Sequence, residues 1–286
     1  MNSIKEITIA HSPDSDDAFM FYALAKEKLD ACGLKINQVL KDIQSLNEDA
    51  KLGRYEVSAI SMAAYPFVKD KYYLMPCGAS MGNKYGPILV AKPGVKLSDI
   101  DKLKIGIPGK LTTAYLTLSI YQKNLNTVEM PFDKIMASVV DGDIDAGLII
   151  HEGQLTYGEF GLINLLDLGQ WWYELTQLPL PLGGNVIRKD LPKELINKLT
   201  LLLTNAIKYS LANRSQALDY ALTFARDMDP KLADKFVGMY VNEFTVDYGT
   251  QGRMGIQKLF EYANKAQIFQ EVIKPEFVEL DNLAIK

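Results

Sequence analysis

The 286-residue sequence has few of the side chains that bind metals or form disulfides. It holds two histidines, His11 and His151, and two cysteines, Cys32 and Cys77. The cysteines lack the spacing of a zinc or redox motif. The HExxH pattern of zinc proteases fails because residue 155 is leucine. We therefore expect no metal site, and we expect both cysteines to be inert thiols.

Long apolar runs and an excess of basic residues are also missing. No stretch approaches the roughly 18 apolar residues of a membrane span, and the N-terminal residues do not resemble a signal peptide. Lys and Arg number 31 against 35 Asp and Glu, which gives a net charge of −4. This balance argues against nucleic acid or an anionic membrane as a partner. We expect a cytoplasmic monomer or homodimer that binds a small molecule.

Strand-like and helix-like segments alternate along the chain. Residues 6–11, 34–40 and 85–92 are typical of strands, and residues 16–31 of an amphipathic helix. From residue 193 onward the apolar spacing is mostly helical. Such alternation predicts an α/β fold with mainly parallel sheets covered by helices.

Two strand-rich passages flank a middle unit of the chain. We therefore expect two lobes: lobe I from residues 1–92 and 185–286, and an inserted lobe II from residues 93–184, joined by two crossings. Hinged pairs of α/β lobes bind small molecules in the cleft between them. Ligands of open α/β sheets gather where the strands end, so the loops after strands are the first candidates for a site.

The loop after the first strand reads HSPDSDDAF and is rich in aspartate. Asp14, Asp16 and Asp17 do not fit a calcium loop, because the spacing and the distal glutamate of that motif are missing. Acidic residues at a helix start favour capping and the helix dipole. We expect capping here, and for His11 a structural role ahead of a role in the cleft.

The loop GIPGKLTTAYL joins a strand to a helix but is not a Walker loop, because Lys110 is followed by leucine. A glycine turn that opens a helix presents backbone N–H groups and the positive end of the dipole to an anion. Thr112 and Thr113 add hydroxyls. From spacing alone, ligand binding and simple capping are equally supported.

A third loop, LIIHEG, places His151 directly after an apolar strand. A buried histidine satisfied by hydrogen bonds is a common structural feature. A general base is the alternative, because histidine titrates near neutral pH and the end of a strand points toward a cleft. Gly153 would permit close approach of the backbone to a ligand.

Four segments together carry a family resemblance. SPDSDDAFMFYAL, CGASMGNKYGPILV, GIPGKLTTAYL and the run IHEGQLTYGEFGLINLLDLGQWWYELTQLPLPLGG resemble the 1,4-dihydroxy-6-naphthoate synthases of the futalosine route to menaquinone. The resemblance covers nearly the whole chain. It implies a two-lobed fold like that of type 2 periplasmic binding proteins, with the ligand cleft between the lobes, in a cytoplasmic enzyme.

The resemblance also implies a reaction and its residues. The reaction is the carbon–carbon lyase step that converts cyclic dehypoxanthine futalosine into 1,4-dihydroxy-6-naphthoate, and it needs no cofactor. The proton acceptor of the family falls on His151. The positions that correspond to the family's substrate-binding residues are Asn47, Ala59, Ile60, Ser61, Thr112, Thr113 and Ala114.

The sequence departs from the family pattern at several points. The usual opening, close to SPCPNDTF, is replaced at Asp14, Ser15, Asp16 and Ala18. Ala59 stands where a lysine is common. Gln154 stands where an arginine often follows the motif histidine. These changes indicate a divergent subgroup and affect the contact residues more than the reaction class.

Two other functions remain open from the sequence. A non-catalytic solute-binding protein of the same fold would bind substrate without forming product. The sister enzyme chorismate dehydratase, which shares the fold and the pathway, would consume chorismate, and the IHE…TY run argues against it.

Overall fold

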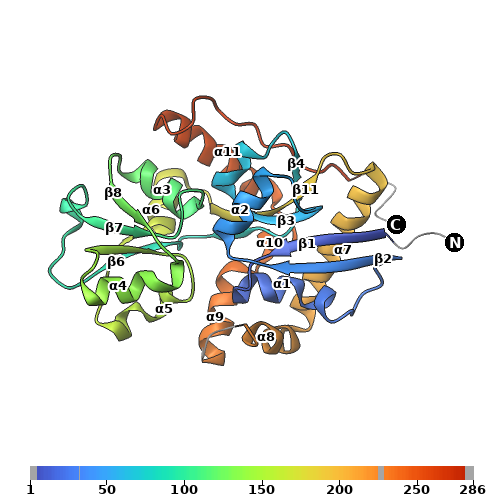
Figure 1. The fold of residues 1–286 in the computed structure, drawn as a ribbon, viewed down its shortest axis with the longest axis horizontal. Coiled ribbons are helices and arrows are strands. Elements are labelled where there is room, and N and C mark those ends of the chain that lie inside the picture. Colours follow the sequence, from blue (N-terminus) through green and yellow to red (C-terminus); the bar gives the residue numbers. More distant parts are fainter. Residues whose placement is uncertain (1–4, 32, 225–228, 281–286) are drawn as a thin grey trace. The chain divides into compact units, whose positions relative to one another are not determined.

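The computed structural model describes residues 5–31, 33–224 and 229–280. The chain divides into two compact units, each with its own sheet (Figure 1). Unit 1 comprises Met1–Ser80, Gly183–Gly249 and Pro275–Lys286, and unit 2 comprises Met81–Leu182 and Thr250–Lys274. Both units mix strands with helices, as the sequence predicts for a two-lobed α/β protein.

The unit boundaries differ from the expected ones. Strand β6 (Ile88–Ala91) pairs with β9 (Ala146–Ile149) in the sheet of unit 2, so residues 81–92, expected in lobe I, belong to unit 2. Helix α11 (Gly249–Lys265) supplies most of the second segment of unit 2. The chain therefore passes between the units four times, where the sequence predicts two crossings.

The sheet of unit 1 has the strand order β2-β1-β3-β11-β4, and β5 pairs with β11. β1 is parallel to both β2 and β3, whereas β11 is antiparallel to β3 and β4. The strands are β1 (Lys5–His11), β2 (Leu34–Leu40), β3 (Val57–Ser61), β4 (Tyr72–Leu74), β5 (Ser80–Gly82) and β11 (Leu180–Arg188).

Both faces of this sheet are covered by helices. Ile7 and Ile9 of β1 alternate onto the face that packs with α1 and α7, while Ala10 joins Leu46 of α2 in a separate cluster on the other face. Figure 1 shows α1 and α2 on opposite sides of the strands. Every residue of β3 is buried, as expected for a strand covered on both faces.

Among its described residues, unit 1 contains five helices of nine or more residues and two shorter ones. Helix α1 ends at Ala25, earlier than the predicted residue 31, because Glu27 adopts a positive φ of 49° that no helix continues through. The helices are α1 (Ser15–Ala25), α2 (Ile43–Lys51), α7 (Lys193–Ala212), α8 (Arg214–Leu222), α9 (Pro230–Tyr240), α10 (Glu243–Val246) and the 3₁₀ turn η1 (Met62–Phe67).

The sheet of unit 2 has the order β10-β6-β9-β7-β8. β7 (Lys104–Ile107) is parallel to β8 (Asn126–Glu129) and to β9, whereas β6 is antiparallel to β9 and to β10 (Ile163–Asp167). Both sheets are thus mixed rather than mainly parallel. The antiparallel strands β6 and β11 enter their sheets without the helical crossover that parallel neighbours require.

The helices of unit 2 are short except for α11, which has 17 residues. Ile135 and Val139 of α4 cover one face of the sheet in a cluster with Val90 and Ile149. The helices are α3 (Thr113–Tyr121), α4 (Ile135–Asp141), α5 (Gly153–Thr156), α6 (Leu168–Thr176) and α11, with the 3₁₀ turns η2 (Leu97–Asp99), η3 (Phe132–Lys134) and η4 (Tyr157–Phe160). None of the helices in the described part of the chain is long and apolar enough to cross a membrane.

Candidate active site

The carboxyl ends of β1 and β3 lie at one edge of the unit 1 sheet, because these strands are parallel neighbours. Ser61 ends β3 and is 4% exposed. The buried Asn47 of α2 holds it twice: Asn47 Nδ2 donates to Ser61 Oγ at 3.2 Å, and Asn47 Oδ1 accepts from the Ser61 N–H at 2.8 Å. Since the Ser61 hydroxyl accepts from Asn47, its own proton can be donated to a ligand.

The other two predicted residues of this stretch belong to the core. Ala59 packs with Ala10 and Leu46 beneath α2, and Ile60 is fully buried. Through β11, Ile60 pairs with Gly184 and Ser61 with Gly183. Of residues 59–61, Ser61 therefore provides a polar side chain at the end of the strand. Ala59 and Ile60 hold the strand in position by packing in the core.

The aspartate-rich loop is organised differently from a simple helix cap. Asp14 occupies the N-cap position of α1, but its side chain makes no capping hydrogen bond. Asp17 instead accepts from the Ser12 N–H at 2.8 Å, and Asp16 accepts from the Ser80 hydroxyl at 3.1 Å. The loop thus connects the end of β1 to the start of α1 and to the segment of Ser80.

Burial raises the pKa of Asp17 well above its ordinary value, and the charge of Asp16 raises it further, with a smaller effect of Asp14. The Ser12 N–H acts in the opposite direction. Asp17 therefore resists ionisation, and this carboxyl is better suited to hold the loop than to bind a cation.

His11 has the structural role that we expected. It is fully buried, its Nδ1 lies 2.8 Å from the Ser12 carbonyl and its Nε2 lies 3.0 Å from Gln38 Oε1. The ring stacks on Phe21 with centroids 4.1 Å apart. Burial lowers the pKa of His11, which keeps the ring neutral.

In unit 2, the parallel strands β7 and β9 bring a second pair of loops to a common sheet edge. Thr112 is the N-cap of α3: its Oγ1 donates to the Gly109 carbonyl at 2.7 Å and accepts from the Tyr115 N–H at 3.3 Å. Thr113 donates its hydroxyl proton to the Leu182 carbonyl at 2.6 Å. Thr112 therefore caps the helix, and the backbone at Ala114 lies in the first turn, where N–H groups have no intrahelical acceptor.

His151 follows β9 at the same edge of the unit 2 sheet. Its side chain is 13% exposed, its Nδ1 accepts from the Gly153 N–H at 3.0 Å, and its Nε2 lies 3.2 Å from the Phe132 carbonyl. Glu152 Oε2 lies 4.0 Å from Nδ1. Gly153 lies close to this ring: a Cβ at Gly153 would lie 2.8 Å from His151 Cε1.

The contacts of His151 with Phe132 and Glu152 were not predicted from the sequence. Phe132 is 19 residues away, and nothing in its local sequence marks it. The Phe132 ring meets the His151 ring edge to face, with centroids 5.2 Å apart. Glu152 is adjacent in the chain, and this adjacency is a signal that sequence analysis could have used.

The buried Cys77 is a free thiol whose pKa burial raises to about 12, in agreement with an inert role. Cys32 lies outside the described residues. Among the residues that the structure describes, no three His, Cys, Asp or Glu side chains group to hold a metal ion.

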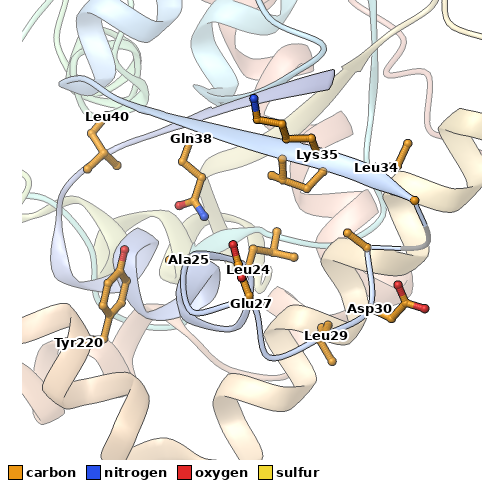
Figure 2. Close-up of a pocket in the computed structure, with 13 residues that line it drawn as sticks. Leu24, Ala25, Glu27, Leu29, Asp30, Leu34, Lys35, Gln38, Leu40 and Tyr220 are labelled. Carbon is orange, nitrogen blue, oxygen red and sulfur yellow. The ribbon is translucent and has the colours of Figure 1, made fainter. Parts of the chain in front are cut away.

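Unit 1 also contains a pocket of about 760 Å³ between the end of α1, β2 and Tyr220 of α8 (Figure 2). Its walls combine apolar side chains with the charged Glu27, Asp30 and Lys35 and with Gln38, the partner of His11. The described residues that line it include none of the predicted site residues. The pocket is therefore separate from the predicted residues at the strand ends of unit 1 and from those at the strand ends of unit 2.

Comparison with known proteins gives consistent results. A family model described as menaquinone biosynthesis matches residues 7–265. A 1,4-dihydroxy-6-naphthoate synthase of Thermus thermophilus is 36% identical over 275 residues, which cover 96% of this chain and all of that protein.

Solved structures extend the comparison. The crystal structure of an Archaeoglobus fulgidus protein is 42% identical, with a TM-score of 0.89, and the match covers 94% of this chain and all of the other. The periplasmic aliphatic sulphonate binding protein of Escherichia coli is 12% identical, with a TM-score of 0.66 and coverage of 98% and 96%. This last likeness shows the fold alone, and it confirms the fold class predicted from the sequence.

Proposed function

Because the chain belongs to the menaquinone-biosynthesis family, we propose that it is a 1,4-dihydroxy-6-naphthoate synthase, which forms this product from cyclic dehypoxanthine futalosine. The full-length match to a relative of that name carries the proposal. The same match confirms the family resemblance carried by the IHE and TTA motifs. The assignment of the substrate and of the catalytic residues goes beyond the match. Both follow from the family resemblance of the sequence, and the placement of Ser61 and His151 where strands end supports the choice of residues.

The proposed reaction begins with proton abstraction by His151. The electron pair left on the substrate breaks a carbon–carbon bond, the sugar-derived fragment leaves, and the remaining ring becomes aromatic. A positioned base supplies roughly 10²–10⁴-fold of the rate. The position of His151 at the carboxyl end of β9, beside the loop after β7, supports this role.

The proposed substrate contacts are the residues that carry the family motifs. Ser61, oriented by Asn47, can donate a hydroxyl proton, and the backbone at Thr113 and Ala114 can donate N–H groups at the start of α3. Thr112 would act by capping that helix. Ala59 and Ile60 would act by placing Ser61.

The direct test is to incubate the purified protein with cyclic dehypoxanthine futalosine and to follow naphthoate absorbance. His151→Ala should lower kcat by about 10²–10⁴-fold, and added imidazole should restore part of the activity, because it can replace the missing base. Turnover of the variant within threefold of wild type would exclude His151 as the base.

The same assay separates the alternatives. Binding of the substrate without product would indicate a solute-binding protein, and consumption of chorismate would indicate the sister enzyme. The cytoplasmic location and the monomeric or dimeric state remain predictions.

A further inference from the structure

The hydrogen bonds of His151 fix its tautomer. A backbone N–H can only donate, so the Gly153 amide requires a lone pair on Nδ1. A carbonyl oxygen can only accept, so Phe132 requires a proton on Nε2. In the described conformation, His151 is therefore a neutral ring with its proton on Nε2.

This arrangement is not that of a base ready to act. The lone pair of Nδ1 is directed at the Gly153 amide, and Nε2 carries a proton directed at Phe132. A second proton on Nδ1 would face the Gly153 N–H, donor against donor. To accept a proton from a substrate, the ring has to leave at least one of these two partners.

Glu152 can hold the ring after that change. Its carboxylate lies 4.0 Å from Nδ1, and its side chain is 19% exposed. A carboxylate that accepts from Nδ1–H fixes the opposite tautomer, leaves the lone pair on Nε2 and stabilises the imidazolium that forms.

We propose that His151 alternates between two positions: a resting position held by Phe132 and Gly153, and a working position in which Glu152 accepts from Nδ1–H and Nε2 faces the substrate. The working position rests on the proposed lyase function. Glu152 is a positioning residue in this scheme, since it acts through His151.

The protons balance across the two positions. On leaving the resting position, the ring releases the Nε2 proton to solvent and takes one up at Nδ1, so it stays neutral. Nε2 then accepts the substrate proton, and the bonding electrons stay on the substrate. The imidazolium pairs with Glu152 until the proton is returned to solvent.

The resting position can be tested without substrate. Long-range proton–nitrogen NMR correlation distinguishes protonated from unprotonated ring nitrogens, and His151 should carry its proton on Nε2. His11, which is fully buried in unit 1, gives a second set of ring-nitrogen signals in the same spectrum and serves as an internal control for folding. A free protein with His151 protonated on Nδ1 would overturn the proposal.

Gly153→Ala tests the same position sterically. The added Cβ would lie 2.8 Å from His151 Cε1, so the ring has to shift. We expect the Nε2–H tautomer of His151 to lose its dominance while the His11 signals stay unchanged. An unaltered His151 tautomer in this variant would contradict the proposed contact.

The working position is tested with Glu152→Gln. We expect kcat to fall by at least about tenfold. The loss should not exceed the roughly 10²–10⁴-fold that the base itself contributes, and KM should change less than about threefold. The free-protein tautomer should stay Nε2–H. The matched control is Glu159→Gln, an exposed glutamate in η4, which should leave kcat unchanged.

The outcomes separate this proposal from the proposed function. If His151→Ala is inactive and Glu152→Gln retains kcat within threefold, the two-position scheme is wrong and the lyase function stands. If the wild type does not turn over the substrate, the proposed function fails and the working position falls with it. The NMR result then still decides the resting position.

Discussion

At the scale of single residues, the half-buried Asp17 makes stability depend on pH. Burial and the charge of Asp16 raise its pKa, so the folded protein binds a proton at this site more tightly than the unfolded chain does. The stability associated with that proton is full below the ordinary value of 3.8 and is lost as the pH rises toward the folded-state value.

Asp17→Asn should remove this loss. Asparagine keeps an oxygen for the Ser12 N–H but does not ionise. As the pH rises from about 4, the free energy of unfolding of the variant should increasingly exceed that of the wild type. The difference should grow by about 1.4 kcal/mol for each pH unit over which the wild type loses stability. Urea unfolding at a series of pH values checks this.

Asp16→Asn is the partial control for that experiment. It removes the neighbouring charge but leaves the Asp17 carboxyl, so a smaller gain is expected. Parallel stability curves for Asp17→Asn and wild type would show that Asp17 ionises normally in the folded protein.

The residue scale also shows how far the candidate site could be predicted. Motif matching identified Asn47 and Ser61 separately, and the structure shows that one holds the other. It identified His151 but not Phe132, because the contact of a ring nitrogen with a distant carbonyl leaves no pattern in the sequence. Strand ends are predictable from periodicity, whereas the hydrogen bonds made there depend on tertiary placement.

At the scale of secondary structure, the start of α6 requires glycine. The N-cap Asp167 accepts from the Gly169 and Gln170 N–H groups. A Cβ at Gly169 would lie 1.9 Å from the Tyr85 carbonyl oxygen. The helix start therefore lies directly against the backbone of the loop that precedes β6.

Gly169→Ala should destabilise the protein by about 1–3 kcal/mol, because backbone has to move to accept the methyl group. Gly158→Ala is the matched control: a Cβ at that position meets no atom within 4 Å, so an effect within about 0.5 kcal/mol is expected. Thermal or urea unfolding of both variants measures the difference. Equal stability of the two would mean that the helix start is not tightly placed.

The observed bounds of a strand match the predicted bounds where turn residues flank a strand-like pattern in the sequence. β2 (Leu34–Leu40) has the predicted bounds because a regular strand pattern lies between turns. The strand predicted at 85–92 is shorter, Ile88–Ala91, because Gly86 contacts Gly169 and the Pro87 carbonyl accepts from Leu168. Such long-range contacts override local pattern, and no window of sequence contains them.

At the scale of the whole chain, the alternation of strands and helices predicted two α/β lobes but not how the chain is shared between them. The amphipathic pattern of residues 252–267 identifies a helix with one apolar face. It does not reveal which sheet that face covers. The structure assigns α11 to unit 2, where Gly255 approaches the Pro179 carbonyl and Tyr262 contacts Trp172.

This assignment has a consequence for unfolding. Trp171 and Trp172 are the two tryptophans of the chain, and both lie in unit 2. Trp172 is fully buried, donates its indole N–H to the Pro179 carbonyl and meets the Tyr262 ring with centroids 5.6 Å apart. Tryptophan fluorescence therefore reports on unit 2, including its late segment.

Tyr262→Ala should move the fluorescence transition to lower urea by the equivalent of about 1–3 kcal/mol, because it removes the aromatic pair and the apolar area of the ring. Met254→Ala on the same helix is the control, since this side chain is 52% exposed, and its effect should stay within about 0.5 kcal/mol. A fluorescence midpoint that Tyr262→Ala leaves unchanged would mean that α11 does not contribute to the core around Trp172. The late segment of the chain would then be dispensable for unit 2, contrary to the packing of Gly255 and Tyr262.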